Sequence, residues 1–382
     1  MPELNRPPAR LKIGQGKISG YLSIFLAVLS LGGVICFHFP EYFTTPEFRV
    51  YYPIELLRYL LLACLVFAFG FALTSLLLSK KTRLPFISML IAAMAILLGG
   101  STVEVKDFDQ SILNIGLDWL LIDILVLSCI FIPIELFFPK RRDQSKFHPE
   151  WKTDLVYFAV GHLLVQMTAI LIKYPAELMF RQFGMREIQL IVKGWPFMLQ
   201  LLLALVLADL FQYTAHRMFH ADRFLWRFHA VHHSIRAVDW LAGSRLHLLD
   251  VIVTRAFSYI PLYFCGFSMV VFYVYVAIVA LQAVAAHANT RISFGWLRYI
   301  LVTPQYHHWH HSDDPAVYDK NFAIHFPFID KLFGTYYLPG DKWPETMGLG
   351  AEKFPKGYLR QFIYPFLRDP RNSQNLSDPS DR

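Results

Sequence analysis

Residues 54–79 read IELLRYLLLACLVFAFGFALTSLLLS. This run can cross a bilayer as one helix, because a spanning helix needs about 20 mostly apolar residues. Similar runs lie at 84–100, 116–138, 21–38, 153–173 and 196–214. Residues 250–288 are long enough for a hairpin of two spans that turns near Cys265 and Gly266. The sequence therefore predicts about eight spans in an all-α, polytopic membrane bundle.

The composition agrees with a membrane protein. Of the 382 residues, 55% are hydrophobic and 17% are charged, whereas soluble domains carry about 25% charged residues. The net charge is 36 − 29 = +7, but no basic stripe with interleaved aromatic residues occurs, so nucleic acid is not an expected partner. The four cysteines lie in or beside apolar runs and form no CxxC motif, which is typical of small core residues.

The charged loops predict an orientation. Lys and Arg gather in the N-terminal tail, in the loop 79–83 and in the loop 139–146, whereas acidic residues occupy the alternate loops. Cytoplasmic loops are enriched in Lys and Arg, so the N-terminus is expected in the cytoplasm. Counting onward places 216–249 and 288–382 on the same side. The expected membrane is the plasma or inner membrane, or the endoplasmic reticulum, depending on the source.

This pattern predicts a domain organisation with a boundary at the 139–152 loop, because the residues that suggest chemistry all follow it. The expected parts are a cytoplasmic tail (1–20), a transmembrane domain of about four helices (21–138), a cytoplasmic linker (139–152), a catalytic domain (153–340) and a C-terminal cytoplasmic tail (341–382).

Eleven of the 15 histidines fall between 216 and 311. They form HRMFH (216–220), HAVHH (229–233) and HHWHH (307–311), with two single histidines at 247 and 287. A spacing of three or four residues places imidazoles on one face of a helix. One H-x-x-H-H is expected by chance roughly 0.02 times in such a chain, and two occur. We therefore expect a metal site in a histidine-rich helical cap that faces the cytoplasm.

The residues alone leave the metal open. The chain has no H-E-x-x-H, so a zinc protease would lack its general base. The E-x-x-H pairs of carboxylate di-iron bundles are also missing. A site built only from histidine binds iron, zinc, copper or nickel.

The order of the motifs resembles the fatty acid hydroxylase / sterol desaturase superfamily of integral-membrane di-iron enzymes. The stretch from Asp209, DLFQYTAHRMFH, is similar to the D-x3-Y-x2-H-R-x2-H helix of that family. TPQYHHWHH (303–311) matches T-P-x2-H-x2-H-H, and NFAIHFPFIDKLFGTYY (321–337) matches the segment that closes the catalytic domain. The resemblance covers roughly 150–340 and does not reach the first 140 residues.

The resemblance implies a set of metal ligands. It comprises His216, His220, His229, His232, His233, His287, His307, His310 and His311. His247 is a further candidate, because SRLHLLD resembles an R-x-H-P-x-E stretch with Leu248 for Pro and Asp250 for Glu. Many members place a second histidine four residues after the one that corresponds to His287, and here that position is Arg291. His308 is expected to lie outside the ligand set.

Asp209, Tyr213, His216 and His220 follow the spacing i, i+4, i+7 and i+11, so they form one stripe along a helix. Asp209 is a candidate to accept the free N–H of a ligand histidine and fix its tautomer. A helix-packing aspartate is the alternative. Tyr213 is the second candidate for a catalytic role.

The resemblance further implies two iron ions, O2 and a membrane lipid as substrate, with zinc able to displace iron on overexpression. No nucleotide, haem or iron–sulfur motif is found, so electrons are expected from a separate electron-transfer protein or reductase. HRMFH, TPQYHH and DKNFA favour the alkylglycerol monooxygenase-like branch, which uses a reduced pterin. The expected activity is hydroxylation of a C–H bond in a fatty acyl, ether lipid or sterol-like substrate.

Three alternatives stay open at this point. A desaturase or C-4 methyl oxidase of the same family would use the same site. A zinc-dependent membrane hydrolase would need a carboxylate base near the motifs. A non-catalytic metal- or lipid-binding membrane protein would need no turnover.

Overall fold

The protein is described from a computed structural model that covers residues 14–45, 49, 51–79, 82–105, 114–164, 171–172, 186–350 and 354–367. These residues are helical apart from loops and one isolated bridge between Ser312 and Met347, and no strand forms among them. The prediction of an all-α chain is confirmed. The chain divides into two compact units: residues 1–132, 143–147 and 162–170 form the first, and the remainder forms the second.

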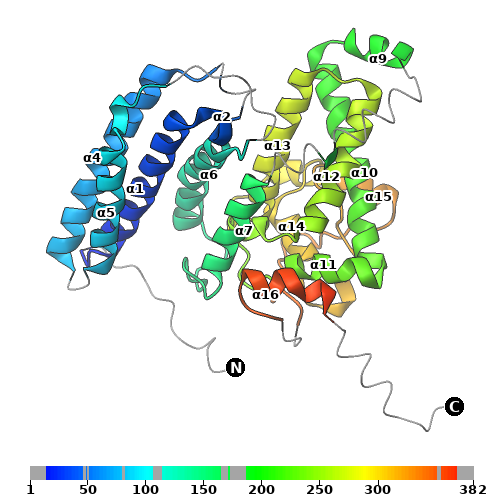
Figure 1. Ribbon diagram of the computed structural model, residues 1–382. Coiled ribbons are helices and arrows are strands. Elements are labelled where there is room, and N and C mark those ends of the chain that lie inside the picture. The colour runs from blue at the N-terminus through cyan, green and yellow to red at the C-terminus, as the bar shows by residue number, and fades with distance from the viewer. Residues whose placement is uncertain are drawn as a thin grey trace. The chain divides into compact units, whose positions relative to one another are not determined.

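The first unit contains four long helices: α1 (Lys17–His38), α4 (Ile54–Leu78), α5 (Arg83–Leu97) and most of α6 (Leu117–Phe137) (Figure 1). The short α2 (Pro40–Phe43) follows α1, and the 3-10 turn η1 (Gly100–Thr102) follows α5. α1 packs against α4 and α5 through small side chains, among them Ala27, Ala68 and Ala92. Small residues let membrane helices approach closely, where lipid tails offer no hydrophobic drive for association.

The second unit surrounds three long helices, α10 (Phe197–Ala221), α12 (Leu248–Cys265) and α13 (Met269–His287). Its other helices are α7 (Trp151–Leu163), which begins in this unit, α9 (Arg186–Lys193), α11 (Arg223–His233), α14 (Pro304–His310), α15 (Pro327–Leu332) and α16 (Tyr358–Ile363), with 3-10 turns η2 (Ala242–Ser244), η3 (Gly295–Tyr299), η4 (Pro315–Val317) and η5 (Tyr364–Phe366). Within this unit, α11, α14 and α16 lie at one end of the long helices and α9 lies at the other (Figure 1).

The predicted hairpin of 250–288 is confirmed. α12 ends at Cys265, Gly266 adopts φ 74°, and α13 begins at Met269 with the Ser268 side chain accepting a hydrogen bond from the N–H of Val271. Glycine suits this turn for a second reason, since a Cβ on Gly266 would lie 2.5 Å from the Gln189 side chain.

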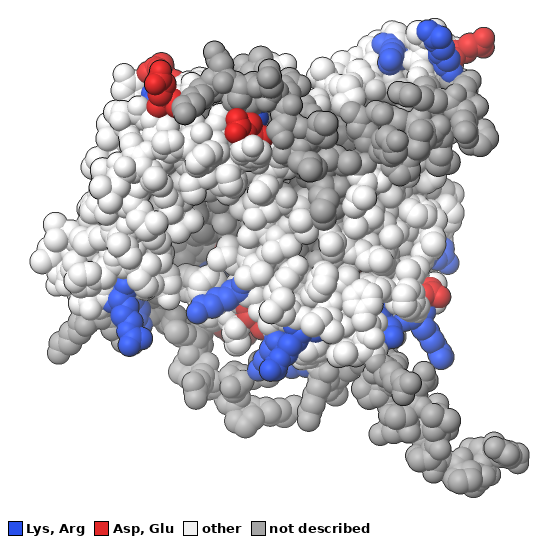
Figure 2. All heavy atoms as spheres, in the orientation of Figure 1, with Lys and Arg blue, Asp and Glu red and all other residues white. Residues whose placement is uncertain are grey.

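Seven helices are long and apolar enough to cross a membrane. They are Lys17–His38, Ile54–Leu78, Arg83–Thr102, Leu117–Phe137, Phe197–Ala221, Leu248–Cys265 and Met269–His287. The eighth predicted span, 153–173, runs into residues outside the described part of the chain. The visible face of the molecule is largely free of charged side chains over the helices (Figure 2), and large apolar side chains such as Leu77 (78% exposed) point outward. The chain is a multi-pass membrane protein.

The predicted helix 196–214 is longer than expected, because it continues to Ala221 and carries the first histidine motif on its last turns. The predicted domain boundaries are not tested by the division into contact units and stay a prediction.

Candidate metal centre

Four elements bring the histidine motifs together. α10 carries His216 and His220 on its last turns, and α11 starts directly after Asp222, whose side chain caps the N–H groups of Phe224 and Leu225. The third motif lies on α14, which begins with the N-cap Thr303 and Pro304. α13 ends at His287. The capping residues Asp222 and Thr303 fix where α11 and α14 begin, and so help to set the positions of the histidines on these two helices.

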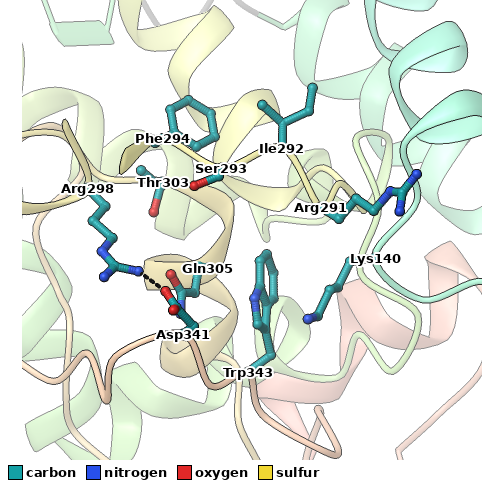
Figure 3. Close-up of a pocket in the computed structure, with 10 residues that line it drawn as sticks. All are labelled: Lys140, Arg291, Ile292, Ser293, Phe294, Arg298, Thr303, Gln305, Asp341 and Trp343. Carbon is teal, nitrogen blue, oxygen red and sulfur yellow. Dashed lines mark hydrogen bonds and ion pairs between the residues drawn. The ribbon is translucent and has the colours of Figure 1, made fainter. Parts of the chain in front are cut away.

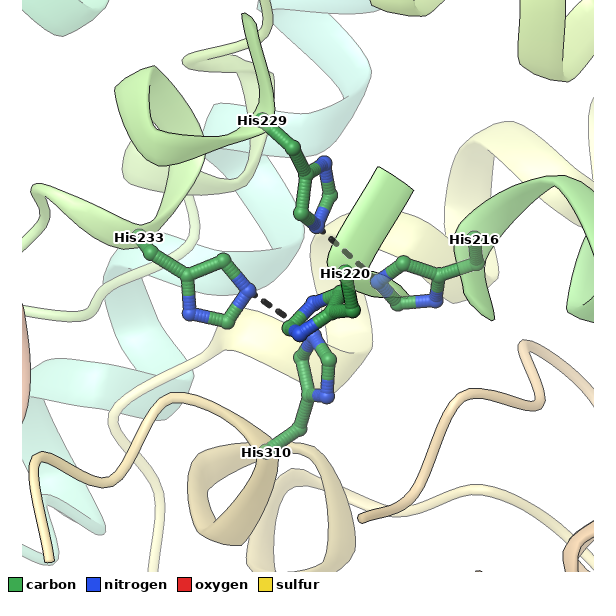
Figure 4. A group of neighbouring side chains, drawn as sticks. All are labelled: His216, His220, His229, His233 and His310. Atoms are coloured by element: carbon green, nitrogen blue, oxygen red, sulfur yellow. Dashed lines mark hydrogen bonds between the residues drawn. The ribbon is translucent and has the colours of Figure 1, made fainter. Parts of the chain in front are cut away.

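Five histidines form one group, which we call group A. Its members are His216, His220, His229, His233 and His310, and one ring nitrogen from each lies within 4.8 Å of the others (Figure 4). The Nε2 atoms of His216 and His229 are 3.0 Å apart, as are those of His233 and His310. His220 is the one member that is not fully buried.

Four histidines form group B. They are His232, His287, His307 and His311, and all four are buried. The Nε2 of His287 lies 3.0 Å from that of His307, 3.1 Å from that of His311 and 3.3 Å from that of His232. Nitrogen ligands at 2.0–2.1 Å from one first-row ion would lie roughly 3.0–3.4 Å from one another. The spacing in group B therefore fits a single metal ion.

The outer ring nitrogens decide which atoms face inward. In group A, the Nδ1 of His216 donates to the Phe322 carbonyl (2.8 Å) and that of His310 to the Lys320 carbonyl (2.8 Å). In group B, the Nδ1 of His287 donates to the Ala283 carbonyl (2.7 Å) and that of His232 to the Arg245 carbonyl (3.2 Å). A neutral imidazole that donates through Nδ1 presents a lone pair at Nε2. Lone pairs that face one another at about 3 Å repel unless a cation lies between them.

Burial keeps these rings neutral. Removal from water lowers the pKa of His229, His232 and His233 well below the usual value, and neighbouring imidazoles lower it further. The same causes act on His307, His310 and His311. Metal ligation requires a deprotonated ring nitrogen, so the chain presents these histidines in the form that binds an ion without loss of a proton.

A strained loop supports group A. Asp319 and Asn321 are the two non-glycine residues with positive φ in the described chain, at 57° and 62°. The loop directs the Asp319 carboxylate to the Nδ1 of His220 (3.1 Å) and also supplies the Lys320 and Phe322 carbonyls. The Asn321 side chain holds it in place through the Tyr306 and Tyr337 backbone. Such strain costs about 1–3 kcal/mol per residue and persists where surrounding contacts enforce it.

Asp250, rather than Asp209, accepts a hydrogen bond from a histidine of the motifs. Its Oδ2 lies 2.7 Å from the Nδ1 of His229, and the residue is fully buried. Asp209 accepts the backbone N–H groups of Ile324, His325 and Phe326, and so anchors the segment after the strained loop. These contacts fit the alternative interpretation of Asp209, in which it is a helix-packing aspartate.

Tyr213 and His247 lie outside both groups. Tyr213 packs on Phe322, and its hydroxyl is 2.9 Å from Thr335 Oγ1. The Nδ1 of His247 caps the N–H of Leu249, and its Nε2 donates to the Phe362 carbonyl (3.0 Å). Both ring nitrogens of His247 are therefore engaged within the protein.

His308, which the sequence analysis expected outside the ligand set, belongs to neither group. It is buried, and its Nε2 donates to the carbonyl of His287 (3.2 Å).

Group B depends on residues that the sequence analysis did not select. Arg245 is 1% exposed and is held by Asp154 and Glu150, which fixes the carbonyl that His232 uses. A Cβ on Gly243 would lie 2.8 Å from the Nδ1 of His287, so only glycine fits there. The SRLHLLD stretch contains this arginine, but no feature of the sequence indicates that its backbone carbonyl would orient His232.

Comparison with known proteins agrees with this geometry. Residues 201–335 match the fatty acid hydroxylase family. The ornithine lipid hydroxylase of Rhizobium tropici is 36% identical over 177 residues, which are 46% of this chain and 53% of the relative. An alkylglycerol monooxygenase of Danio rerio is 27% identical over 227 residues (56% and 50%), and the C-4 methylsterol oxidase of Schizosaccharomyces pombe is 28% identical over 143 residues (36% and 46%).

The chain spans about half the length of these relatives. No solved structure matches it.

Proposed function

We propose that this membrane protein is an O2-dependent oxidoreductase that hydroxylates a C–H bond of a lipid, because residues 201–335 match the fatty acid hydroxylase family. One oxygen atom enters the C–H bond, and the other leaves as water with two electrons and two protons from an external donor. The N-terminal membrane domain (21–138) and the catalytic domain (153–340) of the sequence analysis are part of this proposal.

The observation that carries the proposal is the pair of histidine groups, in which Nε2 lone pairs face one another. We propose that group A holds one iron ion through His216, His220, His229, His233 and His310, and that group B holds the second through His232, His287, His307 and His311. Bound iron supplies the redox chemistry with O2 that C–H oxidation requires. An all-histidine set admits this metal, and zinc is a competitor for the same ligands.

The chain's own residues hold and shield the reaction site. The carbonyls and carboxylates described above orient each ring, as outer-shell partners do in metal sites. Eight of the nine ligand histidines are buried, which keeps water from the reacting carbon. His220 is the one member of intermediate burial, and its side chain is 6% exposed.

The substrate is proposed to be a lipid that reaches the site within the bilayer. Names of the relatives refer to an ornithine lipid, alkylglycerols and methylsterols, which share a long apolar body. We propose a fatty acyl or ether-lipid chain as the substrate. Desaturation or C-4 methyl oxidation would use the same centre and differ in product.

The electron donor is proposed to be a separate protein, with a reduced pterin as the second choice.

We place the N-terminus and both histidine groups on the cytoplasmic side of the membrane. The distribution of charged residues over the loops supports this orientation. In the first unit, Lys17 and Arg83 begin α1 and α5 at one end, while Glu41 and Glu55 lie at the opposite end.

The test is elemental analysis of the purified protein, followed by lipid analysis after reaction under 18O2. Close to two irons per chain, with loss of iron in His310→Ala, and one 18O atom in a hydroxylated lipid are the expected results. If zinc is found, the protein is reloaded with ferrous iron and oxygen uptake is measured. A protein that binds no stoichiometric metal would contradict the proposal and favour the non-catalytic alternative.

A further inference from the structure

A separate cavity lies in the second unit and shares no residue with groups A and B. It is a cavity of about 270 Å³ lined by Lys140, Arg291, Arg298, Asp341, Trp343 and five neighbours (Figure 3). Two of these neighbours are buried and lie at the start of α14: Thr303 is the N-cap of the helix, and Gln305 is in its first turn. None of the lining residues is a candidate metal ligand.

The cavity lies where two candidate membrane helices end. α6 ends at Phe137, three residues before Lys140, and α13 ends at His287, four residues before Arg291. The N–H of Arg291 donates to the carbonyl of Phe138 (2.8 Å), which ties these two exits together. The ends of spanning helices lie at the level of the lipid head groups.

The charge of the lining suits an anion. Three cations and one carboxylate give a net charge of 3 − 1 = +2. Arg298 is paired with Asp341, whereas Lys140 lies with its ammonium 4.9 Å from the centroid of the Trp343 ring. Figure 3 shows Lys140 directed toward Trp343, whereas the exposed side chain of Arg291 extends away from the other lining residues. Lys140 and Arg291 are therefore the cations available to an incoming anion.

An exposed apolar segment continues from this rim. Residues 292–301 read ISFGWLRYIL, and Trp296 is 69% exposed. The other large exposed side chains of the segment are Ile292, Phe294, Leu297, Tyr299, Ile300 and Leu301. Tryptophan and tyrosine concentrate at membrane–water interfaces, and arginine and lysine reach from there to head groups. The segment thus indicates that lipid, rather than bulk water, borders the cavity.

We propose that this cavity binds the phosphate group of a membrane lipid, with Lys140 and Arg291 as its principal contacts. Arginine offers a planar fork of donors to phosphate, and lysine adds a compact charge. This site gives a role to Arg291, which stands where many members of the superfamily have a histidine. The inference does not rest on the oxygenase proposal, because binding requires neither metal nor turnover.

Native mass spectrometry of the full-length protein in detergent tests the proposal. The probes are phosphatidylglycerol, phosphatidylcholine and inorganic phosphate, added separately. The double variant Lys140→Gln/Arg291→Gln is expected to bind phosphatidylglycerol at least about tenfold more weakly than the unchanged protein, because two charge-assisted contacts are lost. The control Lys342→Gln/Arg223→Gln removes the same charge from exposed residues that do not line the cavity, and should bind as the unchanged protein does.

Each outcome decides the point. Equal retention of phosphatidylglycerol by the double variant and the control would overturn the site. Binding of inorganic phosphate that matches phosphatidylglycerol in affinity would overturn the assignment to lipid and leave a free-anion site. Arg291→Lys retains the charge and is expected to retain most of the binding, which separates loss of the site from loss of the fold.

Discussion

The two histidine groups differ in number and in the way their rings are held. Group A has five candidate ligands, one of them partly exposed, and is supported by two carboxylates and the strained loop at 319–322. Group B has four buried candidate ligands, and two of its rings donate to backbone carbonyls within or beside helices. A set of five candidate ligands tolerates loss of one member better than a set of four. We therefore expect metal binding in group B to be the more sensitive to removal of a histidine.

Removal of a central ligand should give the largest effect. His287 lies within 3.3 Å of three partners, so His287→Ala is expected to remove the group B ion and abolish lipid oxidation. His233→Ala leaves four members in group A and should retain more metal. Elemental analysis of both variants, with His38→Ala as a histidine control outside both groups, measures the difference. Equal losses in the two variants would contradict the asymmetry.

Removal of the carboxylates should give the next largest effect, within group A. Asp250→Asn is expected to weaken metal binding about 10–100-fold, as loss of a buried outer-shell partner does. Asp319→Asn should weaken it less, because the Asp319 side chain is 69% exposed and water can replace it. Competition with a chelator measures both affinities. A larger effect from Asp319 than from Asp250 would show that the loop, rather than the buried acid, controls group A.

Added volume at Gly243 should disturb group B alone. In Gly243→Ala the new Cβ would lie 2.8 Å from the Nδ1 of His287. We therefore expect the free energy of unfolding to fall by about 1–3 kcal/mol and the occupancy of the group B ion to decrease. Gly161→Ala is the matched control, since a Cβ there has no atom within 4 Å. Thermal denaturation and metal analysis give the two readings. Unchanged metal content in Gly243→Ala would show that His287 can shift without loss of the site.

The last expected effect concerns stability alone and leaves the candidate ligands unchanged: it is a pH dependence that comes from the ion-pair cluster of His148, Asp154 and Asp239. Burial lowers the pKa of His148, the carboxylates of Asp154 and Asp239 raise it, and the balance raises the pKa to about 9. A raised pKa means that His148 adds stability that is complete below its unfolded pKa of about 6.5 and is lost as the pH rises through about 9.

Across that window the free energy of unfolding should fall by up to about 1.4 kcal/mol per pH unit. Denaturation in detergent between the two pH values measures the slope, which His148→Gln should flatten. A variant with the same slope as the unchanged protein would place the titrating group elsewhere.

Much of the fold, and the histidines that form the candidate ligand set, could be predicted from the sequence. Long apolar runs predict spanning helices directly, because lipid requires every backbone polar group to be satisfied within the helix. The turn at Gly266 and the all-α class followed from the same runs and are confirmed. The histidine motifs were visible because helical spacing places their rings on one face.

The division of those histidines into two groups was decided only by tertiary structure. His232 and His233 are neighbours in sequence, yet successive residues on a helix point in different directions, so they enter different groups. Adjacent His310 and His311 separate in the same way.

Long-range packing decided the partners. Asp250 lies 21 residues from His229, and the Lys320 and Phe322 carbonyls carry no side-chain signal at all. The sequence by itself thus determined which residues can bind metal, because that property belongs to side-chain chemistry and local helical spacing. Only the tertiary structure decided which of them lie together in one candidate site and what holds each ring, because those contacts join segments that local spacing does not relate.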